Sequence, residues 1–149
     1  MREPRKRAPL VGGRTLRRVR GPLAVAVLAA AVGACGTLSE RRDAVRDVTA
    51  AFEKALDEGA YGRVCAALAP GTVEELAQSA DGSCTKALSA QAPPRGGALR
   101  LADVYGNQAR AVLAKDTLFL SRFDDGWKVV AAGCVRLRKQ PYQCRIKGG

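Results

Sequence analysis

Apolar residues between positions 45 and 56 recur at steps of three and four, the spacing that places side chains on one face of an α-helix. The members of this stripe are Val45, Val48, Phe52 and Leu56. Charged residues of both signs occupy the other positions, so we expect the stripe to face a protein core and not a membrane. A Thr-x-x-Glu capping box at Thr37 and Glu40 predicts where the helix begins, and Gly59 predicts its end.

Shorter helical segments are expected before the next long loop. The segment from Tyr61 to Ala69 has helical spacing, and Pro70-Gly71 is expected to end it. A second Thr-x-x-Glu sequence predicts a helix that is capped by Thr72 and ends near Ala80. The segment from Cys84 to Leu88 is expected to add one more turn of helix.

Beyond the loop at residues 91–97, short apolar runs alternate with turns, the pattern of an antiparallel meander. The expected strands are Leu99–Tyr105, Ala109–Ala114, Thr117–Phe123, Trp127–Gly133 and Tyr142–Lys147. Asp124-Asp125-Gly126 predicts a hairpin, because Asp-Gly supplies the positive φ angles that a tight turn needs. These elements predict an α+β fold in which N-terminal helices pack on a curved antiparallel sheet of four or five strands.

The N-terminal segment has the layout of a bacterial export signal. A basic stretch runs to Arg20, an uncharged apolar run extends from Leu23 to Val32, and small residues follow. The apolar run is about ten residues long, whereas a helix needs about 20 to cross a bilayer. A cleaved signal peptide is therefore expected, and a permanent transmembrane helix is disfavoured.

The junction Val32-Gly33-Ala34-Cys35 resembles the bacterial lipobox, in which an aliphatic residue and two small residues precede the cysteine that receives diacylglycerol. The alternative is ordinary cleavage that leaves Cys35 as a free thiol. The expected organisation is a signal peptide over residues 1–34, a lipidated tether over 35–38 and a single α+β domain over 39–149. A palmitate-type lipid on Cys35 would hold this domain at the outer face of the cytoplasmic membrane.

The remaining cysteines number four, an even count in a chain sent to an oxidising compartment. They allow three pairings, and the simplest are the local ones, Cys65–Cys84 and Cys134–Cys144. A zinc site is the alternative, but the sequence has no His and no Cys-x-x-Cys. Disulfides are therefore preferred and no metal is predicted.

The net charge of +11 at first suggests a nucleic-acid partner, but its distribution argues against one. Residues 1–34 carry +7 of it, so the chain that remains after signal cleavage carries only +4. That remainder has one cluster of basic residues, near its end: Arg136, Arg138, Lys139, Arg145 and Lys147. This cluster has two interpretations, a solvated strand edge or attraction to anionic lipid or an acidic partner.

The segment Ala51–Pro70, AFEKALDEGAYGRVCAALAP, resembles the opening helices of nuclear transport factor 2-like, or SnoaL-like, proteins. An aromatic residue after the Asp-Gly turn, here Trp127, fits the later strands of that family. Residues 38–147 also resemble small actinobacterial lipoproteins. The resemblance implies a cone-like domain whose mouth forms a pocket, used by some members for catalysis and by many as a binding or assembly module.

Candidate catalytic chemistry is sparse. The absence of His removes the commonest acid–base residue near neutral pH. Asp103 and Tyr105 lie two apart on an expected strand and could line a pocket, or could be a solvated pair. We therefore predict no catalytic residue and no cofactor, and expect a binding or accessory domain with a possible envelope protein partner. A small-molecule carrier and, less favoured, an enzyme built around Asp103 and Tyr105 are the alternatives.

Overall fold

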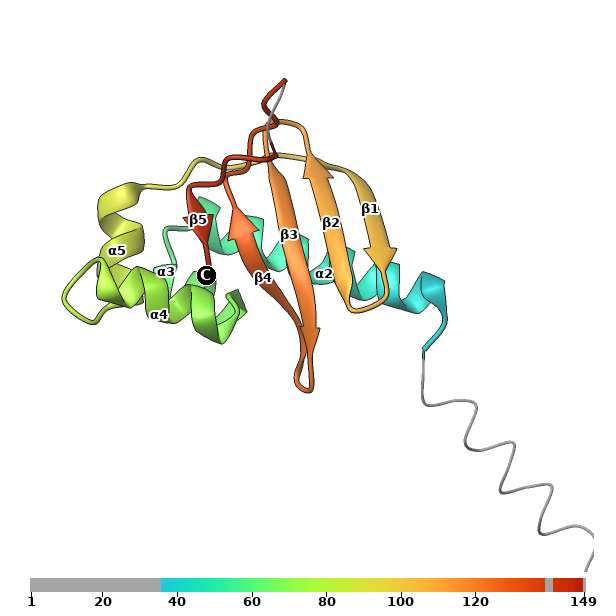
Figure 1. Ribbon diagram of the computed structural model, residues 1–149, viewed down its shortest axis with the longest axis horizontal. Coiled ribbons are helices and arrows are strands. Elements are labelled where there is room, and N and C mark those ends of the chain that lie inside the picture. The colour runs from blue at the N-terminus through green and yellow to red at the C-terminus, as the bar shows by residue number, and fades with distance from the viewer. Residues whose placement is uncertain (1–35, 139–140, 149) are drawn as a thin grey trace, which may run out of the picture. The chain divides into compact units, whose positions relative to one another are not determined.

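The computed structural model describes residues 36–138 and 141–148, and in them four helices precede five strands (Figure 1). The expected signal peptide and Cys35 lie outside the described residues, as does Lys139. The helices are α2 (Leu38–Asp57), α3 (Tyr61–Ala67), α4 (Pro70–Gln78) and α5 (Cys84–Gln91). The strands are β1 (Leu99–Tyr105), β2 (Gln108–Leu113), β3 (Thr117–Phe123), β4 (Gly126–Ala132) and β5 (Ile146–Lys147). The compact unit begins at Gly36, three residues before the expected boundary at 39.

The sheet is an open antiparallel meander in the order β1-β2-β3-β4-β5, so the predicted α+β class is confirmed. The β1–β2 turn pairs Tyr105 with Gln108, and the β3–β4 turn pairs Phe123 with Gly126. Gly126 has a φ of 120° and therefore occupies a conformation that favours glycine. The last strand is shorter than expected, because only Ile146 and Lys147 pair with β4.

Helix α2 runs along one face of the sheet, and the core lies between them (Figure 1). Its buried residues include Phe52, whose side chain is fully buried, as are the sheet residues Leu118 and Leu120. Helices α3, α4 and α5 gather at the β4–β5 end of the sheet (Figure 1). There the backbone N–H of Ala69 donates to the carbonyl of Val129, which ties the α3–α4 junction to the free edge of β4.

The predicted capping box begins α2 as expected. The Thr37 hydroxyl accepts a hydrogen bond from the Glu40 backbone N–H at 3.3 Å, and the Glu40 carboxylate accepts from the Thr37 N–H at 2.6 Å. Two backbone N–H groups at this helix end, those of Thr37 and Glu40, therefore have side-chain partners. The start of α2 is fixed immediately after Gly36.

The second predicted capping box is wrong. Helix α4 begins at Pro70, with Ala69 as its N-cap residue and no side-chain cap. Proline suits the first helical position, because its fixed φ is pre-organised and its missing N–H is not needed there. Thr72 lies inside the helix, buried, and its hydroxyl donates to the carbonyl of Val130 at 3.1 Å. It therefore ties α4 to β4 instead of capping the helix.

Disulfides join Cys65 to Cys84 and Cys134 to Cys144, which are the two local pairings. The first links α3 to the first residue of α5. The second closes a small hairpin in which Val135 and Gln143 exchange two backbone hydrogen bonds, of 2.9 and 3.0 Å. All four sulfurs are covalently paired and therefore cannot act as zinc ligands. We call residues 134–144 the disulfide hairpin.

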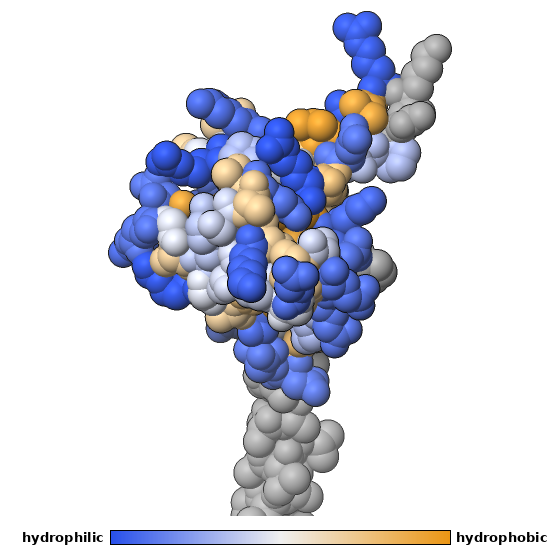
Figure 2. Space-filling view, turned by 90° about the vertical axis from the view of Figure 1, so that its left-hand side faces the viewer, coloured by the Kyte–Doolittle hydropathy of each residue, from blue (hydrophilic) through white to orange (hydrophobic). Residues whose placement is uncertain are grey.

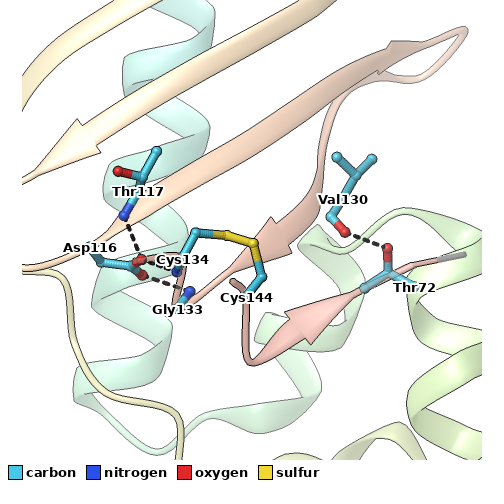
Figure 3. The surroundings of a disulfide bond; sticks show 7 residues. All are labelled: Thr72, Asp116, Thr117, Val130, Gly133, Cys134 and Cys144. Carbon is cyan, nitrogen blue, oxygen red and sulfur yellow. Dashed lines mark hydrogen bonds between the residues drawn. A yellow bond between two sulfur atoms is a disulfide. The ribbon is translucent and has the colours of Figure 1, made fainter. Parts of the chain in front are cut away.

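A buried carboxylate holds the start of the disulfide hairpin against the β2–β3 turn (Figure 3). Asp116 is only 8% exposed and accepts backbone N–H bonds from Thr117, from Gly133 at 2.9 Å and from Cys134 at 2.6 Å. Burial raises the pKa of Asp116, and the three donors oppose that shift. The sequence indicated only a turn at this position.

We expect Asp116→Asn to lower the free energy of unfolding by about 1–3 kcal/mol at neutral pH, because an amide nitrogen cannot accept from a buried N–H. Chemical denaturation of the oxidised protein measures this. Asp124→Asn, in the exposed β3–β4 turn, is the control and should change stability by less than about 0.5 kcal/mol. Equal effects of the two substitutions would show that the Asp116 bonds do not stabilise the fold.

Candidate functional site

A pocket of about 480 Å³ lies between the N-terminal half of α2 and the β3–β4 hairpin. This volume falls within the range of small-molecule binding sites, roughly 300–1,000 Å³. Its apolar lining consists of Ala44 and Val48 from α2 and Trp127 from the start of β4. The helical stripe places Val48 on the sheet side of α2, and the hairpin brings Trp127 opposite it. Gly36, the first described residue, also lines the pocket.

Trp127 is the only tryptophan in the sequence and is 5% exposed. The guanidinium carbon of Arg41 lies 5.9 Å from the centre of its ring, within cation–π range. The Arg41 side chain also donates to the carbonyl of Gly106 in the β1–β2 turn. Arg41 thus links α2 to two hairpins and covers one side of the indole.

Charges of both signs surround the pocket, and most of them are engaged elsewhere. Glu40 caps α2, and Asp125 pairs with Lys128 at 3.0 Å. Arg41 and Arg122 oppose the three carboxylates of Glu40, Asp47 and Asp125. No strong excess of either sign faces the cavity, so its chemistry favours an apolar or neutral molecule over a highly charged one.

Two nitrogen atoms on pocket residues are buried and unpartnered among the described residues. They are Nε of Arg41 and Nε1 of Trp127. Buried indole N–H groups usually have an acceptor, because leaving a donor unsatisfied is unfavourable.

Asp103 and Tyr105 do not belong to the lining of this pocket. Asp103 accepts a hydrogen bond from Arg110 at 2.6 Å on the neighbouring strand, and this bond raises the pKa of the Arg110 guanidinium. Tyr105 is 63% exposed. The buried residues of the same strands, Ala102 and Ala109, alternate with this pair and face the core. Asp103 and Arg110 therefore form a cross-strand ion pair on the sheet face away from α2.

Glu53 is a second carboxylate that accepts hydrogen bonds from backbone N–H groups. It accepts N–H bonds from Gly96 at 2.8 Å and Gly97 at 3.2 Å, and burial raises its pKa. A Cβ atom on Gly96 would lie 2.8 Å from that of Asp116, so the loop requires glycine here. Glu53 fixes the loop before β1 to the C-terminal third of α2, a structural use that explains its partial burial.

The predicted basic cluster lies on and beside the disulfide hairpin, where Arg136, Arg138, Arg145 and Lys147 are exposed. No Asp or Glu follows Asp125 in the sequence. Val135 is 52% exposed in the same hairpin. Figure 2 shows orange apolar atoms beside blue hydrophilic ones at the top of the molecule, where Figure 1 places this part of the chain. The hairpin therefore presents cationic and apolar groups together.

Comparison of the chain with family models, with curated proteins and with solved structures finds no match. Within residues 36–138 and 141–148, no helix has the length and apolar character needed to span a membrane. The same residues contain no cluster of three or more side chains suited to hold a metal ion. The pocket between α2 and the β3–β4 hairpin is therefore the candidate site on the basis of its geometry.

We expect Arg41→Ala to expose Trp127, because the guanidinium covers one side of its ring. Its fluorescence should shift to longer wavelength, acrylamide should quench it more strongly, and stability should fall by about 0.5–1 kcal/mol. The control is Arg42→Ala on an exposed position of the same helix. With a single tryptophan, the signal reports this pocket alone. Identical spectra for both variants would contradict the contact.

Proposed function

We propose that this protein is an exported lipoprotein of the bacterial cell envelope, anchored by a palmitate-type lipid on Cys35. Its domain would lie at the outer face of the cytoplasmic membrane. The observation that carries the proposal is the use of cysteines. Four of the five form two disulfides, as expected in an oxidising compartment, and the fifth follows a signal-like segment and a lipobox-like junction.

The domain itself is proposed to bind and not to catalyse. The sequence has no His, and the carboxylates of Asp116 and Glu53 hold backbone N–H groups. Asp103, the notable acid of the sheet, is tied to Arg110. These features argue against the alternative of an enzyme built around Asp103 and Tyr105.

A relationship to the nuclear transport factor 2-like fold remains part of this proposal. Its support is the order of elements, helices followed by an antiparallel meander, and a pocket between the first described helix and a hairpin. That pocket favours a small-molecule carrier as the second candidate function, because its volume suits a ligand. The exposed cationic side chains of the disulfide hairpin support the first candidate function, that of an accessory module that contacts an acidic envelope partner.

Replacement of Cys35 by Ala should move the protein from the membrane fraction to the soluble fraction and abolish labelling by a clickable palmitate analogue. Ser39→Ala, close to the same helix end, should remain membrane-bound and labelled. Wild-type protein, denatured without reductant, should show no reactive thiol, because lipid and two disulfides occupy all five sulfurs. One free thiol together with a soluble wild-type protein would instead indicate ordinary cleavage.

A further inference from the structure

We propose that a pocket beside the disulfide hairpin is a docking site for an acidic peptide segment that carries one apolar side chain. The pocket has a volume of about 500 Å³, and its lining consists of Leu137, Pro141, Tyr142, Gln143, Cys144 and Lys147. This inference rests on the proposed accessory function, to which it adds a site and the chemistry of the partner. The apolar side chain enters the pocket, and its acidic neighbours meet the surrounding cations.

The first argument is that both arms of the hairpin are held in place before a partner binds. The disulfide joins Cys134 to Cys144, and Val135 and Gln143 exchange two backbone hydrogen bonds between the arms. The carboxylate of Asp116 accepts from the N–H groups at the start of the hairpin (Figure 3). A binding surface that is ordered in advance loses less conformational entropy on association.

The second argument is the position of the lining residues on the sheet face away from α2. Register places Phe119, Ala131 and Lys147 side by side on β3, β4 and β5. The neighbour of Lys147, Ile146, is fully buried, so the Lys147 side chain points away from the core. The ring of Tyr142 packs edge-on against that of Phe119, with 5.0 Å between their centres. The hairpin and β5 thus contribute to the same pocket on this face.

Charge is the third argument. Arg136, Arg138, Arg145 and Lys147 are exposed, and none of them forms an ion pair with another described residue. The sequence has no Asp or Glu after Asp125, so these cations lack acidic neighbours along the chain. Guanidinium groups bind carboxylates with two parallel hydrogen bonds, which a peptide rich in Asp and Glu supplies.

The apolar residues decide between kinds of anion. Leu137 is 36% exposed and Val135 is 52% exposed, although both side chains are large and hydrophobic. A phosphate polymer has no apolar side chain to cover them, and a flat layer of lipid headgroups does not fill a concave pocket. A peptide supplies an apolar anchor for the pocket and carboxylates for its rim, as in interfaces with a buried centre and a polar surround.

The test uses the full chain, purified in detergent without reductant so that both disulfides are retained. The probe is a short fluorescein-labelled peptide of Asp and Glu around one central Phe, and its matched partner has Ala in place of Phe. Fluorescence anisotropy at physiological ionic strength measures the two dissociation constants. We expect the Phe peptide to bind about tenfold more tightly than the Ala peptide, because its ring is buried in the pocket.

Two variants with matched controls locate the binding. Leu137→Ala should weaken binding of the Phe peptide about fivefold and leave the Ala peptide unchanged, and its control is Leu101→Ala at an exposed leucine of β1. Lys147→Glu should weaken binding of both peptides about fivefold, and its control is Arg100→Glu, also exposed on β1. Both controls should bind the peptides as the wild-type chain does. Circular dichroism and thiol titration check that each variant is folded and oxidised.

The outcomes separate this inference from the proposed function. Equal binding of the two peptides to the wild-type chain would overturn the inference, because charge alone would explain it, and would leave an acidic partner standing. Absence of binding by either peptide would overturn the accessory function as well, whereas labelling at Cys35 still decides lipidation.

Three further results decide the location and kind of ligand. A preference for the Phe peptide that is unchanged in a folded Leu137→Ala variant would place the anchor elsewhere and overturn the inference. Displacement of the Phe peptide by phosphatidylglycerol added to the micelles would assign the site to a lipid surface and also overturn it. If a variant fails to fold, the comparison of the two peptides on the wild-type chain decides the question.

Discussion

The packing of α2 against one face of the sheet is the contact on which the rest of the structure depends. Phe52 of α2 is fully buried in the same core as Leu118 and Leu120 of β3. Because this contact fixes the helix relative to the strands, it also fixes the positions of the pocket and of the loop before β1. Toward its start, α2 forms one wall of the pocket, and farther along, Glu53 holds the loop that enters β1.

The two ends of the sheet are stabilised by different means. At the end that carries the disulfide hairpin, polar groups dominate: Asp116 collects three N–H donors, and Glu53 collects two. At the end that carries Gly36, the β1–β2 and β3–β4 turns meet α2 through Arg41 and Trp127. The second end also contains the pocket and two buried donors without partners among the described residues, Arg41 Nε and Trp127 Nε1, whereas at the first end Glu53 Oε1 is buried without a partner.

Local patterns were sufficient for much of the fold. The Thr37 capping box, the strands Leu99–Tyr105 and Thr117–Phe123 and the local disulfides follow from spacing along the chain. The failures involve contacts between distant segments. Thr72 has the sequence context of a helix cap, but it bonds Val130, 58 positions away, and Pro70 starts the helix in its place.

The candidate site was harder to predict for the same reason. Asp103 and Tyr105 were chosen because they share a strand face, but register places Arg110 opposite Asp103. The pocket instead combines Ala44 and Val48 with Trp127, which come from segments separated by most of the domain. The turn residues Asp124-Asp125-Gly126 predicted the β3–β4 hairpin. Its position beside the start of α2 depends on tertiary packing, which local patterns do not predict. The lipid junction lies outside the described residues, so its assignment stays a prediction.

The capping box at Thr37 fixes the first turn of α2, which begins at Leu38. If Cys35 is lipidated as proposed, only Gly36 and Thr37 separate it in sequence from α2, and the domain would diffuse laterally with its anchor in the plane of the membrane. Its encounters would then be confined to two dimensions. Under that proposal, a partner must either lie in the same membrane or come to its surface to reach the exposed cationic side chains of the disulfide hairpin.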